Sequence, residues 1–228
     1  MTKYSKTELK SKAKTIRANI KQGKGLPTSI TLKDTDGKIH NLKKTEYLGL
    51  YHQQNIFITR HGRYPNWVTQ NTTYGRLPVA QNYQDNAYTC CPTSFSMATM
   101  CLFDYHSESE CARVLGTVYG SGTDPSNLVA NAKKLGYTAT PIPRNYQAVL
   151  KSLQKGKPVI CHYETGGNTK PSCMGFRNNY GHYCLIYWCK KGNYYIADPT
   201  KGQAICKATA MDKATNGRNI KYYSIGIL

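Results

Sequence analysis

The sequence predicts an α+β fold, in which helices come first and an antiparallel sheet follows. Over most of residues 1–156, apolar side chains recur every three or four positions, which is the spacing of one helix face. From residue 157 onward, short apolar runs alternate with turn residues, which indicates strands. Helices followed by strands are typical of α+β proteins rather than of parallel α/β folds. A chain of 228 residues has room for one or two such domains.

Two helices and a strand are expected near the N-terminus. Residues 7–22 have an apolar stripe followed by glycine, and residues 26–32 (LPTSITL) form a short strand. Residues 43–60 form the second helix, with an apolar face of Tyr47, Leu48, Leu50 and Tyr51.

A sequence repeat links these elements. The segment IKQGKGLPTSIT (20–31) aligns with ITRHGRYPNWVT (58–69), matching a proline, two β-branched positions and a threonine. The match is either a coincidence between two helix–turn–strand elements or a repeated binding module, with one full copy and the start of a second. We expect a small repeat domain over residues 1–72, and a second domain over residues 73–228.

The second domain begins with helices and ends with strands. Capping residues suggest helix starts after Ser107 and Asp124, and Gly136 suggests a helix end. The expected helices are 92–104, 108–115, 125–135 and 145–156. The expected strands are 157–163, 181–189, 193–199 and 219–228, with the second and third forming a hairpin around the turn KKG.

The chain is strongly basic, with a formal net charge of +19. Residues 1–72 contain 14 Lys and Arg against four Asp and Glu, whereas residues 73–228 contain 17 against eight. Such a charge attracts polyanions, namely nucleic acid, an anionic membrane or an acidic cell-wall polymer. No apolar stretch is long enough to span a bilayer, and no apolar segment follows the N-terminal charges. We therefore expect synthesis in the cytoplasm without a signal peptide, and no membrane insertion.

The chain has nine cysteines, all after residue 89. None forms a CxxC pair, which argues against a structural zinc site. For a protein made in the cytoplasm, free buried thiols are the default expectation.

One of these cysteines has the surroundings of a nucleophile. In QDNAYTCCPTSFSM (84–97), Cys90 lies six residues after Gln84 and two residues before Pro92. Proline suits the first position of a helix, so Pro92 predicts that a helix begins there and that Cys90 lies at or near its N-cap. A helix N-terminus favours a thiolate, and the Gln84 amide beside the Cys90 backbone N–H would form an oxyanion hole. Cys91 is the less favoured alternative, and we interpret it as a small neighbour that allows close backbone packing.

A base and its orienting group are expected in the hairpin. His182 begins the strand 181–189, and Asp198 ends the return strand, so the two side chains are predicted to meet at one end of the sheet. A thiol nucleophile needs such a general base, and the carboxylate would hold the imidazole in position. Tyr163, Glu164 and Tyr180 are further candidates near the site by their positions alone.

These motifs resemble those of papain-like cysteine peptidases. The order Gln, Cys-x-Pro, Gly-His and Asp-Pro is most similar to the bacteriocin-processing branch, which usually has Gly after the nucleophile where this chain has Cys91. The blocks TCCPTS, GHYCLIYW and DPTKG look more like the pseudomurein endoisopeptidases, the lysis enzymes of viruses and proviruses of methanogens. Those enzymes carry N-terminal pseudomurein-binding repeats, which the two repeat segments resemble.

This resemblance implies an endolysin that hydrolyses the isopeptide bond between Ala and the Lys side-chain amine in pseudomurein. The catalytic residues would be Cys90, His182 and Asp198, with Gln84 in the oxyanion hole. The acidic wall polymer is the expected partner, and the enzyme would be a monomer that reaches the wall after its release from the cell. No cofactor is required for the chemistry, although the resemblance implies stimulation by Ca²⁺ or another divalent cation at ligands that the sequence does not reveal.

Two other functions remain open at this stage. One is another papain-like acyl-transfer enzyme, such as a processing peptidase or a transglutaminase-like enzyme, because the same residues would serve those reactions. The other is a non-catalytic wall-binding or nucleic-acid-binding protein, which the charge alone would allow. Nothing in the sequence resembles a nucleic-acid-binding motif.

Overall fold

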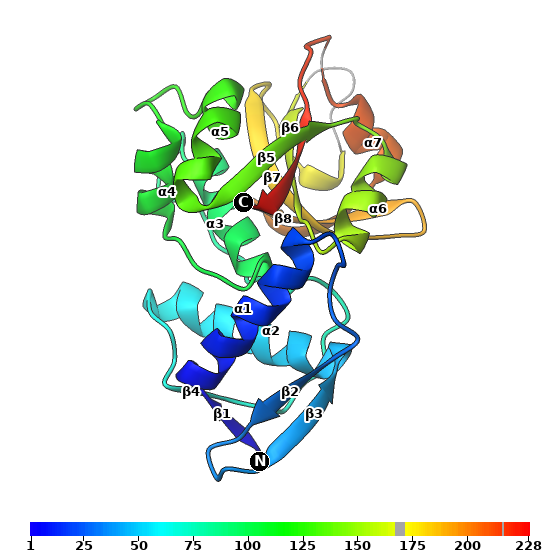
Figure 1. Ribbon diagram of the computed structural model, residues 1–228. Coiled ribbons are helices and arrows are strands. Elements are labelled where there is room, and N and C mark those ends of the chain that lie inside the picture. The colour runs from blue at the N-terminus through cyan, green and yellow to red at the C-terminus, as the bar shows by residue number, and fades with distance from the viewer. Residues whose placement is uncertain (167–171, 216) are drawn as a thin grey trace.

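The computed structural model describes residues 1–166, 172–215 and 217–228. Its largest element is a six-stranded antiparallel sheet in the order β5-β10-β6-β7-β8-β9 (Figure 1). These strands are β5 (Tyr137–Ile142), β6 (Val159–Glu164), β7 (Gly181–Lys190), β8 (Asn193–Asp198), β9 (Gly202–Lys207) and β10 (Tyr222–Ile227). The α+β class and the large antiparallel sheet are therefore as the sequence predicts.

Helices surround this sheet. Helix α3 is buried along its whole length and packs against β7, an interior strand of the sheet. The helical elements of this part of the chain are α3 (Cys90–Cys101), α4 (Glu108–Leu115), α5 (Pro125–Asn131), η1 (Ala132–Leu135), α6 (Tyr146–Gln154), η2 (Ser172–Met174) and α7 (Ala208–Lys213). Within the described residues no helix has the length and apolar character needed to cross a membrane.

The N-terminal residues form two strand–helix–strand units. The first is β1 (Lys3–Ser5), α1 (Lys6–Lys21) and β2 (Ser29–Lys33), and the second is β3 (Ile39–Lys43), α2 (Lys44–His61) and β4 (Trp67–Thr69). The two units match at an offset of 38 residues. Strand β1 pairs with β4 and strand β2 with β3, both antiparallel, so each unit pairs only with the other.

The register of these pairs is symmetric. Tyr4 lies opposite Val68, and the equivalent positions Leu42 and Ile30 lie opposite each other. Exchanging the two units therefore reproduces the same set of strand pairs. The segment thus contains two complete copies, rather than one copy and the start of a second.

The N-terminal units and the sheet domain share one continuous hydrophobic core. Tyr51 of α2 packs edge-on against Phe103, with 4.8 Å between ring centroids. Arg17 of α1 donates to the carbonyl of Leu102 and to the hydroxyl of Tyr137, at 3.0 and 2.9 Å. In Figure 1, α1 and α2 lie directly beneath the sheet domain. The expected boundary near residue 72 is thus a packed junction.

Several elements differ from the sequence-based expectation. Strands β1, β3, β5 and β9 and helix α7 have no counterpart among the elements expected from the sequence, because their residues lack a long apolar pattern. Helix α3 begins at Cys90, so Pro92 is its third residue and not its first. Proline is tolerated there because the first N–H groups of a helix have no partner inside the helix.

Gly49 offers a test of the junction. This residue of α2 faces the chain segment after β4, and a Cβ there would lie 2.9 Å from the carbonyl carbon of Thr72 and 3.3 Å from Cα of Thr73. Glycine to alanine inside a helix normally stabilises by about 1 kcal/mol. We expect Gly49→Ala instead to destabilise the protein by about 1–3 kcal/mol, because the backbone of Thr72 must move.

Unfolding in urea measures the effect. Gly75→Ala is the matched control, since a Cβ there meets nothing within 4 Å. The control should change the free energy of unfolding by less than about 0.5 kcal/mol. Equal stability of the two variants would contradict the close packing at Gly49.

Candidate active site

Cys90 is the first residue of helix α3. Thr89 precedes it as N-cap and is held in a local turn, where its hydroxyl donates to the Asn86 carbonyl at 2.9 Å and accepts from the Asn86 N–H at 3.1 Å. The N–H of a first helical residue has no partner within the helix. The Cys90 backbone N–H is therefore placed to bind an anion, as is expected at the positive end of a helix.

The two adjacent cysteines face different surroundings. Cys90 retains 8% exposure and lines a cleft, whereas Cys91 is fully buried. Burial raises the pKa of the Cys91 thiol well above its usual value, and a hydrogen bond to Thr123 only partly opposes this. Of the two, Cys90 is the thiol that a substrate can reach.

His182 and Asp198 are in direct contact, as the hairpin pattern predicts. The Nε2–H of His182 donates to Oδ2 of Asp198 at 3.0 Å, and both side chains are buried. The register differs from the simple expectation: Leu185 pairs with Ala197, so Asp198 follows opposite residue 184, and His182 lies diagonally from Asp198 rather than directly opposite. Diagonal neighbours on one face of a sheet remain within reach of long side chains.

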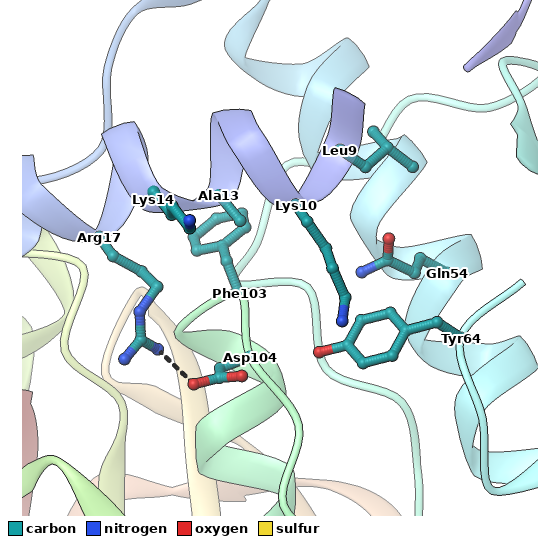
Figure 2. Close-up of a pocket in the computed structure, with 9 residues that line it drawn as sticks. All are labelled: Leu9, Lys10, Ala13, Lys14, Arg17, Gln54, Tyr64, Phe103 and Asp104. Atoms are coloured by element: carbon teal, nitrogen blue, oxygen red, sulfur yellow. Dashed lines mark ion pairs between the residues drawn. The ribbon is translucent and has the colours of Figure 1, made fainter. Parts of the chain in front are cut away.

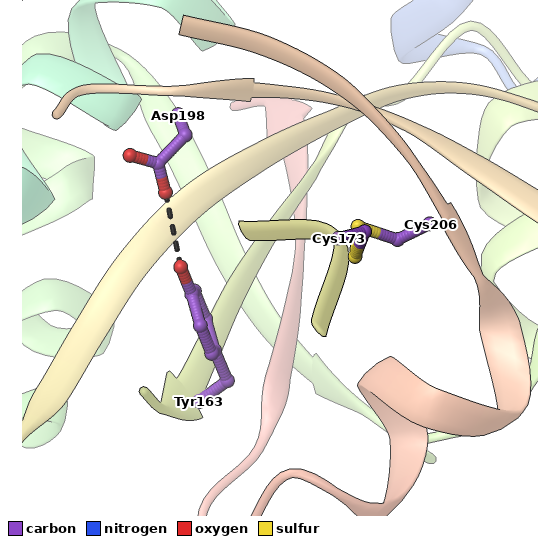
Figure 3. The surroundings of a disulfide bond; sticks show 4 residues. All are labelled: Tyr163, Cys173, Asp198 and Cys206. Atoms are coloured by element: carbon purple, nitrogen blue, oxygen red, sulfur yellow. Dashed lines mark hydrogen bonds between the residues drawn. A yellow bond between two sulfur atoms is a disulfide. The ribbon is translucent and has the colours of Figure 1, made fainter. Parts of the chain in front are cut away.

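Asp198 is held by four hydrogen bonds. Its Oδ1 accepts from the backbone N–H groups of Thr200 and Lys201, each at 2.8 Å. Its Oδ2 accepts from the Tyr163 hydroxyl at 3.0 Å (Figure 3) and from His182. Burial alone would raise the pKa of Asp198, but His182 and the two N–H groups outweigh burial and lower it. The carboxylate is therefore ionised and fixed in orientation.

His182 lines the same cleft as Cys90, and the Cys90 side chain acts on its imidazole together with Asp198. Since Nε2 faces the carboxylate, Nδ1 is the nitrogen left for the thiol. Burial lowers the pKa of His182, but the hydrogen bonds to Asp198 and Cys90 prevail and raise it to about 9. The imidazole thus lies between a sulfur and a carboxylate, in a setting that favours its protonated form.

Gln84 lies at the same cleft. Its backbone N–H donates to the Pro199 carbonyl at 3.0 Å, and its side-chain oxygen accepts from the Thr200 hydroxyl at 2.9 Å. Its amide nitrogen donates to the Asn86 carbonyl at 2.6 Å. An amide carries two N–H donors, so one remains for a substrate oxygen. The loop before Cys90 is in this way joined to the loop after Asp198.

The cleft has a volume of about 830 Å³. Gln84, Cys90 and His182 line it, whereas Asp198 lies behind the imidazole and outside the lining. Of the three positional candidates, Tyr180 lines the cleft, whereas Tyr163 and Glu164 do not.

Tyr163 and Glu164 instead support neighbouring groups. Tyr163 bonds to Asp198, and the buried Glu164 pairs with the largely exposed Arg218, at 3.0 Å between Oε1 and a guanidinium nitrogen. Arg218 lines the cleft and was missed by the sequence analysis, because a lone arginine in a polar stretch gives no signal. The role of Tyr163 could have been found from strand register, because it lies directly opposite His182.

Aromatic rings pack against the imidazole, and a disulfide lies close in sequence to one of them. The ring of Phe176 lies 5.1 Å and that of Tyr163 lies 5.5 Å from the ring of His182, centroid to centroid. Cys173, three residues before Phe176, forms a disulfide with Cys206 of β9 (Figure 3). The expectation that all cysteines other than Cys90 are free was wrong for this pair, whose approach depends on a long-range contact that spacing alone does not reveal. The remaining seven cysteines are free and buried.

No metal site can be assigned. Among the residues that the structure describes, no group of three or more His, Cys, Asp or Glu side chains could hold a metal ion. The divalent cation implied by the sequence resemblance therefore has no identifiable ligands in that part of the chain.

One protein-family model matches most of this chain. The model of the Peptidase_C39 like family matches residues 66–226. No curated protein matches the sequence.

Nineteen chains of solved structures also match. One is a double glycine motif protease from an AMS/PCAT transporter, in complex with its leader peptide, with 19% identity over 68% of this chain and 95% of that chain and a TM-score of 0.49. Another is the peptidase domain of Streptococcus ComA, a bifunctional ABC transporter of a quorum-sensing pathway. The match has 16% identity, covers 65% of this chain and 98% of that chain, and has a TM-score of 0.48. A third is a C39-like peptidase from Bacillus anthracis. This match has 14% identity, covers 66% of this chain and 97% of that chain, and has a TM-score of 0.49.

The raised pKa of His182 predicts a pH-dependent stability. A histidine whose pKa rises from 6.5 to about 9 on folding stabilises the folded state fully below pH 6.5, and this contribution is lost as the pH rises through about 9. We expect the free energy of unfolding of the wild type to fall between pH 7 and pH 10 by about 2 kcal/mol more than that of His182→Gln.

Urea unfolding at a series of pH values, under reducing conditions, measures this difference. Asp198→Asn should remove much of it, because the carboxylate is one of the two partners that raise the histidine pKa. Parallel pH profiles of the wild type and His182→Gln would contradict the assignment of a charged imidazole.

Proposed function

This chain belongs to the Peptidase_C39 like family, and on that premise we propose that it is a cysteine endoisopeptidase that cleaves Ala–(ε)Lys cross-links of pseudomurein and lyses methanogen cell walls. Membership of this family indicates, without the substrate, that the chain is a cysteine peptidase of papain-like fold. The observation that supports catalysis most directly is the position of His182, which hydrogen-bonds to Asp198 and lines the same open cleft as Cys90.

The reaction begins with proton transfer. His182 accepts the thiol proton of Cys90, and the resulting thiolate attacks the carbonyl carbon of the Ala residue. The carbonyl oxygen becomes an oxyanion, which accepts hydrogen bonds from the Cys90 backbone N–H and the free amide N–H of Gln84. The preference of His182 for its protonated form supports this first step.

The bond then breaks in two stages. Protonated His182 gives its proton to the departing Lys amine, which leaves a thioester between Cys90 and the Ala acyl group. His182 next takes a proton from water, which attacks the thioester. Collapse of this intermediate releases the carboxylic acid, and His182 returns the proton to the Cys90 sulfur, which regenerates the thiol. Asp198 holds the imidazole in one orientation throughout and stabilises its charge.

Sequence features support pseudomurein as the substrate. The blocks around Cys90, His182 and Asp198 resemble those of pseudomurein endoisopeptidases, and the net charge of +19 suits an acidic polymer. The largely exposed guanidinium of Arg218 lines the cleft and adds a positive charge that an acidic substrate could contact. We propose the two N-terminal units as the wall-binding part, with the protein acting as a monomer on the wall after its release from the cell.

Purified pseudomurein walls test the proposal. We expect the wild type, under reducing conditions, to lower the turbidity of the walls and to release free Lys ε-amines. Cys90→Ala should abolish both, because no other exposed thiol lines the cleft within the described residues. Cys91→Ala is the matched control and should retain activity within a few-fold, since Cys91 is buried and faces Thr123.

The outcomes separate the alternatives. Undiminished lysis by Cys90→Ala would sink the catalytic assignment. Intact walls together with cleavage of an ordinary α-peptide would favour a processing peptidase. Wall binding with no cleavage by any variant would favour a non-catalytic binding protein.

Gln84 provides a test of the oxyanion hole. We expect Gln84→Ala to reduce kcat by roughly 10²–10³, with KM nearly unchanged, because the amide would contact the substrate oxygen only as charge develops on it. Steady-state kinetics on a soluble isopeptide measure both constants. A change confined to KM would indicate that Gln84 contributes only to substrate binding.

A further inference from the structure

A second cavity, of about 280 Å³, lies where α1 and α2 meet the loop after α3 (Figure 2). Lys10, Lys14 and Arg17 reach it from α1, Gln54 from α2, and Asp104 from the sheet domain. None of these residues takes part in the cysteine chemistry. The cavity is therefore a separate feature, built at the junction of the N-terminal units with the sheet domain.

Two of its three cations are not neutralised. Arg17 pairs with Asp104 at 3.2 Å and also donates to Tyr137, so its charge is used inside the structure. Lys10 and Lys14 form no ion pair with any carboxylate in the described part of the chain. Lys10 instead holds its ammonium group 4.1 Å from the ring centroid of Tyr64, beside the cavity.

Gln54 is the second indication of a ligand. Its side chain is buried overall, with 4% exposure, and it lines the cavity without a hydrogen bond to another side chain or carbonyl of the described residues, so that its amide meets the open space of the cavity. Its neighbour Asn55, by contrast, donates to the carbonyls of Pro78 and Met100. An amide in this position can donate to, and accept from, a ligand that enters the cavity. In Figure 2 the Gln54 amide points toward the cavity, which is where a partner would come from.

The cavity wall is held in a fixed shape. Phe103 has a left-handed backbone conformation, with φ of 61°, which is unfavourable for a residue with a Cβ. Its buried ring packs against Tyr51, and the preceding carbonyl of Leu102 accepts from Arg17. Strained backbone of this kind persists where the surrounding contacts determine it. The contacts from both parts of the chain thus fix the cavity before any ligand binds.

The chemistry of the lining selects the ligand. Two free ammonium groups suit a carboxylate, and the Gln54 amide can both donate to it and accept from a peptide N–H. Asp104 adds a carboxylate, which disfavours a doubly charged phosphate more than a singly charged carboxylate. Its Oδ1 accepts only the Tyr105 N–H, at 2.9 Å, and so has room for a further donor. A peptide with a carboxylate side chain offers both the acid and the N–H donors.

We infer that this cavity binds the carboxylate side chain of an acidic peptide, with Lys10 and Lys14 contacting the acid and Gln54 the adjoining peptide group. The inference rests on the proposed function only for its partner, because an acidic peptide polymer is what the N-terminal units are proposed to bind. Its location at the end of α3 opposite Cys90 would anchor such a polymer apart from the bond being cut.

Binding of a defined probe tests the inference. The protein is the full chain carrying Cys90→Ala, so that peptidase activity cannot affect the result. The probe is a fluorescent tetra-glutamate peptide with blocked termini, measured by anisotropy at 150 mM salt. We expect Lys10→Gln with Lys14→Gln to weaken binding at least tenfold, and Gln54→Glu to do the same by placing a negative charge in the cavity.

A matched pair separates a site from general attraction. Lys12→Gln with Lys21→Gln removes the same charge from α1 at positions outside the cavity and should change binding less than twofold. Urea unfolding verifies that each variant is folded. Equal loss of binding in the two double variants would overturn the inference, as would equal binding of tetra-glutamine.

Inorganic phosphate distinguishes the source of the anion. We expect millimolar phosphate to compete weakly, because Asp104 lines the cavity. Competition as strong as that of unlabelled tetra-glutamate would overturn the assignment to a peptide carboxylate. These binding results do not depend on cleavage, so a failure of the pseudomurein experiment leaves them interpretable, and the reverse also holds.

Discussion

The buried contact between His182 and Asp198 is the interaction on which the arrangement of the cleft depends. A carboxylate without exposure is costly unless its oxygens are satisfied, and here four donors satisfy them. The donors come from β6, from β7 and from the turn that follows β8. Satisfying Asp198 therefore fixes three adjacent parts of the sheet, and the histidine is oriented toward Cys90 as a result.

The N-terminal units contribute to the same arrangement from the opposite end of α3. This helix has 12 residues, which corresponds to about 18 Å. Cys90 begins it, and the residues just past its end are held by Arg17, which bonds the Leu102 carbonyl and pairs with Asp104. The N-terminal units therefore contact the C-terminal end of the helix, and the Cys90 thiol lies at its N-terminal end. Residues 1–72 therefore help to hold α3 in place and are not an independent domain on a linker.

The sequence predicted those elements whose own residues show a clear apolar pattern, turn or helix cap. The hairpin of β7 and β8 predicted that His182 and Asp198 would meet, and capping residues gave the starts of α4 and α5. The sequence does not predict strands β5 and β9, because β5 contains Pro141 and β9 is largely polar and half exposed, so neither shows a clear apolar alternation. The disulfide and the contribution of Arg218 depend on contacts between distant segments, which no local pattern encodes.

The adjacent cysteines show how helix geometry assigns roles that composition leaves open. Successive residues of a helix point about 100° apart, so two neighbours at its start cannot both face the cleft. Cys90 faces His182, and Cys91 faces the core beside Thr123, where burial opposes ionisation. A small side chain is sufficient at the second position, because that position fills a space in the core and takes no part in the cleft. The departure from glycine at Cys91 is therefore compatible with a nucleophile at Cys90.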